Sequence, residues 1–255
     1  TIQPKFSNYV DWSIFTTKYQ LQNATIETGG ALTVKTHLVV CDNATVNVKT
    51  GSFFYVDKSY TQINTNAAID VSGELRVRQG TELLVKGKLR LKNGGKLIIE
   101  PGAKLTIDYY GVLEYYNGAT IETIDATSSI ILKGVIKTMD ATTFQIINSG
   151  GGTQSAKLYI DGPTTSFQAQ VPAYFKLEGK GINDAFIVLR NSAQLKVQDP
   201  EIITFRVADC TVEVNGGTSI KVERPYYSYR VKYNSLASNG GMTVTGSHVF
   251  NECQF

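Results

Sequence analysis

The chain is poor in cysteine, and this scarcity excludes two kinds of framework. Its 255 residues include three cysteines, Cys41, Cys210 and Cys253, which lie far apart in the sequence. They form no Cys-x-x-Cys pair of the kind typical of zinc sites, and an odd number leaves no complete set of disulfides. We therefore interpret the three cysteines as small buried hydrophobic residues.

An excess of one charge and long apolar runs are also lacking. Lys and Arg number 25 against 22 Asp and Glu, a net charge of +3 that is too balanced to indicate attraction to nucleic acid. No apolar run approaches the roughly 20 residues that a transmembrane helix needs. We therefore expect no nucleic-acid partner and no membrane insertion. There is no signal peptide and residue 1 is Thr, so we interpret the sequence as a processed or excised piece.

A regular spacing of glycines is the main feature that the chain does have. Between Ala67 and Gly118, glycines occupy positions 73, 80, 87, 94, 102, 111 and 118. Apolar and polar residues alternate between them, which predicts short strands with one face toward a core. The predicted inward residues are Leu75, Val77, Leu83, Val85, Leu89, Leu91, Leu97, Ile99, Leu105, Ile107, Leu113 and Tyr115. The predicted outward residues include Arg76, Arg90, Ile98, Thr106 and Glu114.

Every third strand recurs after about 22 residues, a period typical of solenoid coils. Three short strands per coil, separated by tight Gly, Asn or Asp corners, predict an all-β fold, a single-stranded right-handed parallel β-helix. A sandwich or a barrel also contains many short strands, but it normally needs hairpin signals and longer loops. The handedness rests on the general preference for right-handed crossovers alone.

The repeat divides the chain into regions. Residues 1–22 lack the repeat and are rich in aromatic side chains, so we expect an N-terminal cap or an irregular first turn there. Residues 23–255 are the predicted solenoid, regular to about residue 148 and with longer loops in 149–199. No polar cap follows the last strand, which favours a native protein that continues beyond Phe255.

Three phrases of the chain are ATIETGGALTVK at Ala24–Lys35, LIIEPGAKLTID at Leu97–Asp108 and HVFNECQF at His248–Phe255, together 32 of the 255 residues. They resemble the coils of long secreted or cell-surface β-helical proteins of the Bacteroidota. The resemblance implies an exported, extracellular module on a bacterial cell surface, part of a larger multidomain protein. It implies an adhesin or a stalk, and it carries little information on activity.

Parallel β-helices also include polysaccharide lyases and glycoside hydrolases, so we looked for their catalytic residues. A hydrolase needs two or three carboxylates around the scissile bond. The pectin-hydrolysing β-helices have paired Asp residues, His-Gly and Arg-x-Lys, and only Arg230-Val231-Lys232 occurs here. We favour outward strand charges over a catalytic pair at these positions. The strand-terminal Asp108, Asp125, Asp140 and Asp161 are single, and we expect them to bond their own corners.

Two tyrosine-rich clusters are the best candidates for a binding surface. Tyr109, Tyr110, Tyr115 and Tyr116 form one, and Tyr226, Tyr227, Tyr229 and Tyr233 form another beside Arg230 and Lys232. Outward rings stack on sugars or on protein partners, although alternation turns half of each cluster inward. The predicted ligand-binding residues are Tyr226, Tyr227, Tyr229, Arg230, Lys232, Tyr109 and Tyr110. We predict no catalytic residues, no metal and no cofactor.

The leading hypothesis is therefore a non-catalytic structural or adhesive module, a rigid spacer or a surface that presents a ligand-binding site. Its expected partners are other domains of the same polypeptide, surface glycans, and proteins of a host or neighbouring cell. Two alternatives remain open at this stage. One is a carbohydrate-active β-helix with a groove near the loops of Ser149–Asp184 and the Arg230–Lys232 segment. The other is a segment of a phage or virion fibre.

Overall fold

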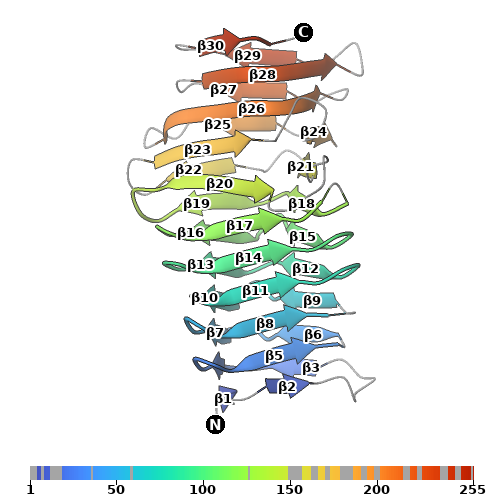
Figure 1. Cartoon of the computed structure of the whole chain (residues 1–255), viewed down its shortest axis with the longest axis vertical. Coiled ribbons are helices and arrows are strands. Elements are labelled where there is room, and N and C mark those ends of the chain that lie inside the picture. The colour runs from blue at the N-terminus through green and yellow to red at the C-terminus, as the bar shows by residue number, and fades with distance from the viewer. Residues whose placement is uncertain are drawn as a thin grey trace.

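The chain is an all-β parallel solenoid in our computed structural model, an elongated stack with the two termini at opposite ends (Figure 1). The structure describes residues 5–6, 9–11, 19–35, 37–57, 60–125, 127–148, 157–161, 166–169, 173–178, 186–190, 194–197, 202–214, 219–222, 226–235, 241–244, 248–253 and 255. No helix in that part of the chain is long and apolar enough to cross a bilayer.

Three sheet faces run along the stack, because every third strand pairs with its counterpart in the next coil. The first face is an 11-stranded sheet: β1 (Lys5–Phe6), β4 (Ala24–Ile26), β7 (Thr45–Val48), β10 (Ala68–Val71), β13 (Lys88–Leu91), β16 (Val112–Tyr115), β19 (Val135–Thr138), β22 (Ser166–Ala169), β25 (Gln194–Val197), β27 (Ser219–Val222) and β29 (Gly241–Val244). The second face is β2 (Tyr9–Asp11), β5 (Ala31–Val34), β8 (Phe53–Val56), β11 (Glu74–Val77), β14 (Lys96–Ile99), β17 (Thr120–Thr123), β20 (Thr143–Asn148), β23 (Ala173–Glu178), β26 (Ile202–Val214), β28 (Tyr226–Ser235) and β30 (His248–Asn251). The third face is β3 (Tyr19–Leu21), β6 (Leu38–Val40), β9 (Tyr60–Ile63), β12 (Glu82–Val85), β15 (Lys104–Ile107), β18 (Ser129–Leu132), β21 (Lys157–Asp161) and β24 (Phe186–Arg190).

The register places apolar residues of successive coils directly above one another. On the second face, Leu32 pairs with Phe54, Phe54 with Leu75, and Leu75 with Leu97, offsets of 22, 21 and 22 residues. The predicted β-helix, its three strands per coil and its period of about 22 residues are therefore confirmed.

The offset widens in the middle of the chain and then contracts. Phe144 pairs with Phe175 and Phe175 with Phe205, offsets of 31 and 30 residues, whereas Phe205 pairs with Tyr226 after 21. Most of the loops expected in 149–199, and most of the cap expected in 1–22, lie outside the described residues.

The bore of the regular coils is filled mainly with aliphatic side chains. All 12 residues predicted to point inward between Leu75 and Tyr115 are at most 1% exposed. Of the residues predicted to point outward, Ile98, Thr106 and Glu114 are nevertheless only 3%, 6% and 7% exposed. Strands of a sheet lie about 4.8 Å apart, so side chains stacked on an outer face cover one another. A low exposed fraction therefore does not distinguish inward from outward side chains here. The alternation of apolar and polar residues along each strand does.

The third strand of a coil merges with the second near the C-terminus. The 13-residue β26 pairs with β23 through its first half and with β24 through its second, so one strand serves two faces. In β28, Tyr226 and Ser228 are buried and then Val231 and Tyr233 are buried, so the inward series shifts by one residue between them. That shift bends the strand around the bore without a glycine corner.

Candidate functional surfaces

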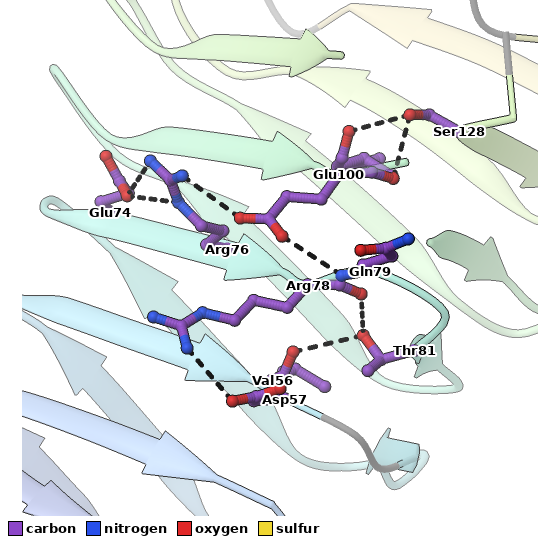
Figure 2. A network of polar contacts seen from close by, with 10 residues as sticks. Val56, Asp57, Glu74, Arg76, Arg78, Gln79, Thr81, Glu100 and Ser128 are labelled. Atoms are coloured by element: carbon purple, nitrogen blue, oxygen red, sulfur yellow. Dashed lines mark hydrogen bonds and ion pairs between the residues drawn. The ribbon is translucent and has the colours of Figure 1, made fainter. Parts of the chain in front are cut away.

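A polar network lies on the second face at β11 and in the corners that follow β11 and β14 (Figure 2). Arg76 binds Glu74 of its own strand at 2.9 Å and Glu100 of the next coil at 3.2 Å. Glu100 also accepts a 3.2 Å hydrogen bond from the backbone N–H of Gln79. Partial burial alone would lower the pKa of the Arg76 guanidinium, but the carboxylates of Glu74 and Glu100 outweigh it, and the pKa is raised. Arg76 therefore remains charged and holds two coils together.

The corner between the second and third faces continues this network. Arg78 binds Asp57 of the preceding coil at 3.1 Å, and its guanidinium lies 4.3 Å from the centre of the Tyr55 ring. The buried Thr81 hydroxyl donates to the carbonyl oxygens of Arg78 at 2.6 Å and Val56 at 3.2 Å. The Val56 carbonyl, which belongs to the coil below, also accepts a 2.9 Å hydrogen bond from the backbone N–H of Arg78, so the Thr81 side chain adds a second contact between the coils.

The same corner is built with a serine two coils further along. The buried Ser128 hydroxyl lies 3.1 Å from the carbonyl oxygen of Ile99 and 3.0 Å from that of Glu100. Asp125 accepts hydrogen bonds from the backbone N–H groups of Thr127 and Ser128, at 2.8 and 3.1 Å. The prediction that Asp125 bonds its own corner is therefore confirmed.

A ladder of alternating charge runs up the first face. Asp70, Arg90 and Glu114 occupy equivalent positions of three successive coils. Arg90 binds Asp70 at 2.9 Å and Glu114 at 3.2 Å. The positively charged side chain in the middle therefore bridges both neighbouring coils.

Ion pairs between neighbouring coils recur throughout the regular part of the stack. They are Lys49–Glu27, Arg76–Glu100, Arg78–Asp57, Lys88–Glu114, Arg90–Asp70, Arg90–Glu114, Lys92–Asp70, Lys96–Glu122 and Lys104–Glu82, at 2.9 to 4.0 Å. Alternation predicts only that these charges lie on an outward face, and it does not predict their pairing. The signal was present, because opposite charges stand one coil apart in the sequence.

The structure separates the predicted binding residues into exposed and buried groups. Tyr110 is 81%, Tyr109 47% and Tyr227 44% exposed, whereas Tyr229 and Lys232 are half-buried. The prediction that Tyr226 is a surface ring is wrong, because it is 0% exposed and lies in the bore. Arg230 belongs to β28, but its side chain lies outside the described residues.

The two tyrosine clusters are not brought together. Tyr109 and Tyr110 follow β15, whereas the other cluster lies on β28, and β18, β21, β24 and β26 stand between these two strands in the stack. Ligand binding by either cluster remains a prediction. Among the described residues, no three His, Cys, Asp or Glu side chains gather as metal ligands.

A buried hydroxyl network occupies the bore beside β28. The hydroxyl of Tyr233 contacts the hydroxyls of Tyr226 and Ser228. Burial raises the pKa of Tyr233 well above its usual range, and the neighbouring Tyr226 raises it further. The three side chains satisfy one another's polar groups inside the core, which indicates a role in packing.

Comparison with known proteins does not extend this description. No protein-family model and no curated protein sequence matches the chain. Among solved structures, it is similar to a TibC-catalyzed hyper-glycosylated TibA fragment, residues 55–350, with 14% identity over 98% of this chain and 97% of the fragment. The TM-score of that match is 0.21, too low to support an argument about function. Membership of the Bacteroidota group therefore remains a prediction.

Proposed function

We propose that this chain is a non-catalytic structural module of a bacterial cell-surface protein, a rigid spacer whose corners carry any binding sites. Its partners would be the neighbouring domains of the same polypeptide and surface glycans or proteins of another cell. The extracellular location rests on the resemblance of the coil phrases alone.

The pairing of outward charges from coil to coil is the observation that carries this proposal. A catalytic site for glycans needs carboxylates that converge on a bond. Here Glu100, Glu114 and Asp70 each bind a cation of an adjacent coil, so their charge stabilises the stack. A surface ion pair typically contributes at most about 1 kcal/mol, but the partly buried pairs here are repeated along a rod and act together on its rigidity.

Rigidity is directly measurable with two spin labels on one edge of the stack. Thr28 and Ala141 are exposed in equivalent corners, after β4 and after β19. Between β4 and β19 the first face contains four strands, β7, β10, β13 and β16. The two labels are therefore five coil steps apart, about 24 Å along the axis. We expect Thr28→Cys/Ala141→Cys, with the native cysteines changed to serine, to give one narrow distance distribution. A broad distribution in native buffer would contradict the spacer, and the same sample in urea supplies the broad reference.

The non-catalytic part of the proposal has its own test. The protein would be incubated with a panel of polysaccharides, and new reducing ends and unsaturated products would be measured. We expect no turnover. Turnover that disappears in Lys232→Ala would contradict the proposal and favour the carbohydrate-active alternative.

A further inference from the structure

The corner Asp108–Gly111, between β15 and β16, carries the most exposed aromatic pair of the regular coils. We call it the tyrosine corner. Its Tyr110 ring is 81% exposed and its Tyr109 ring 47%. Tyr110 is covered little by its own chain, so its ring contributes little to folding and is available for contact with a ligand, with the half-exposed Tyr109 beside it.

The tyrosine corner projects beyond the corners above and below it. It spans the four residues between Ile107 and Val112, whereas the corresponding corners are the two-residue segments 86–87 and 133–134. These corners stack directly, because the N–H of Asp108 donates to the carbonyl of Val85 at 2.9 Å and that of Lys133 donates to Ile107 at 2.8 Å. A longer corner between two shorter ones leaves Tyr110 approachable along the stack, whereas Lys133 of the next coil lies over the Tyr109 ring.

The backbone of the tyrosine corner is fixed by the neighbouring coil. The N–H of Gly111 donates to the carbonyl of Asp108 at 2.8 Å and closes the turn. Gly134 of the next coil packs so closely that a Cβ there would lie 2.3 Å from the carbonyl oxygens of Asp108 and Gly111. The two rings are therefore presented by a rigid support, which lowers the entropy lost when a ligand binds.

Two lysines flank the tyrosine corner. The Lys133 ammonium lies 5.3 Å from the centre of the Tyr109 ring. Lys86 occupies the corner below, and within the described part of the chain it forms no ion pair. With Asp108 as the one acidic residue of the three stacked corners, the net charge there is +1 (two lysines minus one aspartate). Lys88 nearby is paired with Glu114 at 3.4 Å.

We propose that the tyrosine corner binds an acidic glycan through its uronate sugars. This inference rests on the proposed function and names a ligand class for one corner of the spacer. The apolar face of a pyranose ring is about the size of one tyrosine ring and stacks on it, while a lysine ammonium binds the uronate carboxylate. An acidic protein is the less suitable partner, because a stable protein interface covers about 800 Å² per partner and two rings on a narrow corner offer far less.

The test is a titration of the folded chain with tetragalacturonate, followed by NMR, with maltotetraose as the neutral control. We expect a dissociation constant on the order of 1 mM for the uronate at low salt, about −4 kcal/mol, and at least tenfold weaker binding of the neutral sugar. Binding should weaken as ionic strength rises, because exposed charges are screened. Glucuronate and mannuronate oligomers are titrated in parallel.

Variants of the exposed Tyr110 and of the half-buried Lys86 and Tyr116 locate the site, because none of these side chains lies in the core. Tyr110→Ala should weaken uronate binding at least fivefold, and Lys86→Ala should weaken it and flatten its salt dependence. Tyr116→Ala is the matched control, because Tyr116 also has a lysine ammonium over its ring, that of Lys92 at 4.2 Å, but lies at another corner. It should bind like the parent chain.

Three results would overturn this inference. They are the absence of binding to all three uronates, equal binding of maltotetraose, and equal losses in Tyr110→Ala and Tyr116→Ala. A narrow spin-label distance distribution together with no uronate binding would reject the glycan site but not the proposed function as a rigid spacer. Binding of an acidic peptide in place of the uronates would assign the corner to a protein partner and also reject the glycan site.

Discussion

Two regions of the solenoid bend the chain around the bore in different ways. One is the regular coils from β4 to β19, and the other is the last coils around β26 and β28. The regular coils use strands of three or four residues separated by corners, whereas β26 and β28 run through 13 and 10 residues. In β28 the inward series shifts by one residue after Ser228. The comparison teaches that a solenoid wall bends either at a corner or by a change of which residues point inward.

The bores of the two regions also differ. The regular bore is aliphatic along most of its length, with Leu75, Leu89 and Leu97 fully buried. The later bore contains the hydroxyl network of Tyr226, Ser228 and Tyr233. A purely apolar core tolerates no charge, while a core with polar groups depends on each partner being present.

The largest expected effect is a charge placed in the aliphatic bore. Leu89→Asp should lower the free energy of unfolding by about 4 kcal/mol or more, because an unpaired carboxylate is buried. The adjacent Arg90→Asp changes an outward residue, and should cost about 1 to 2 kcal/mol through the loss of its pairs with Asp70 and Glu114. Urea unfolding of both variants makes the comparison. Equal losses would contradict the assignment of the inward face.

The second largest effect is expected from a glycine substitution at a corner of the regular coils. Gly134→Ala should cost about 3 kcal/mol, because its Cβ would meet two carbonyl oxygens at 2.3 Å. The control, Gly80→Ala, should cost about 1 kcal/mol, because Gly80 has a φ of +71° but open space around it. Thermal melts compare the two. If the Gly80 variant were as unstable as the Gly134 variant, the backbone angle, and not close packing, would determine the need for glycine at these corners.

A third effect concerns the polar bore of the last coils. Tyr233→Phe should cost about 1 to 3 kcal/mol, because it removes the hydroxyl that Tyr226 and Ser228 share. Burial raises the pKa of Tyr233 in the folded chain, so its contribution is fully present below the usual tyrosine value of 10.0 and declines as the pH rises above it. The alkaline loss of stability should therefore be smaller in Tyr233→Phe. Identical alkaline unfolding of both proteins would contradict a buried, protonated Tyr233.

The regular coils were predictable from sequence because two local signals agree there. Alternation identified residues such as Leu105 and Ile107 as inward, and glycine spacing gave the coil length. The long strands escaped prediction because β28 has no glycine at its bend, and its inward series changes phase within the strand. Tyr226 was therefore placed on the wrong face. The candidate surfaces were predictable only in part, because opposite charges one coil apart, such as Arg90 and Glu114, identify an ion pair only once the register of the coils is known.

The smallest effect is also the most direct test of the claim that outward charges hold successive coils together. Arg90→Glu should destabilise the chain by about 1 to 2 kcal/mol, because it places three carboxylates in one ladder. The triple variant Asp70→Lys/Arg90→Glu/Glu114→Lys reverses the ladder and should recover about half of the loss, because Lys92 and Lys88 then face lysines in place of Asp70 and Glu114. No loss in the single variant, or no recovery in the triple variant, would contradict the account.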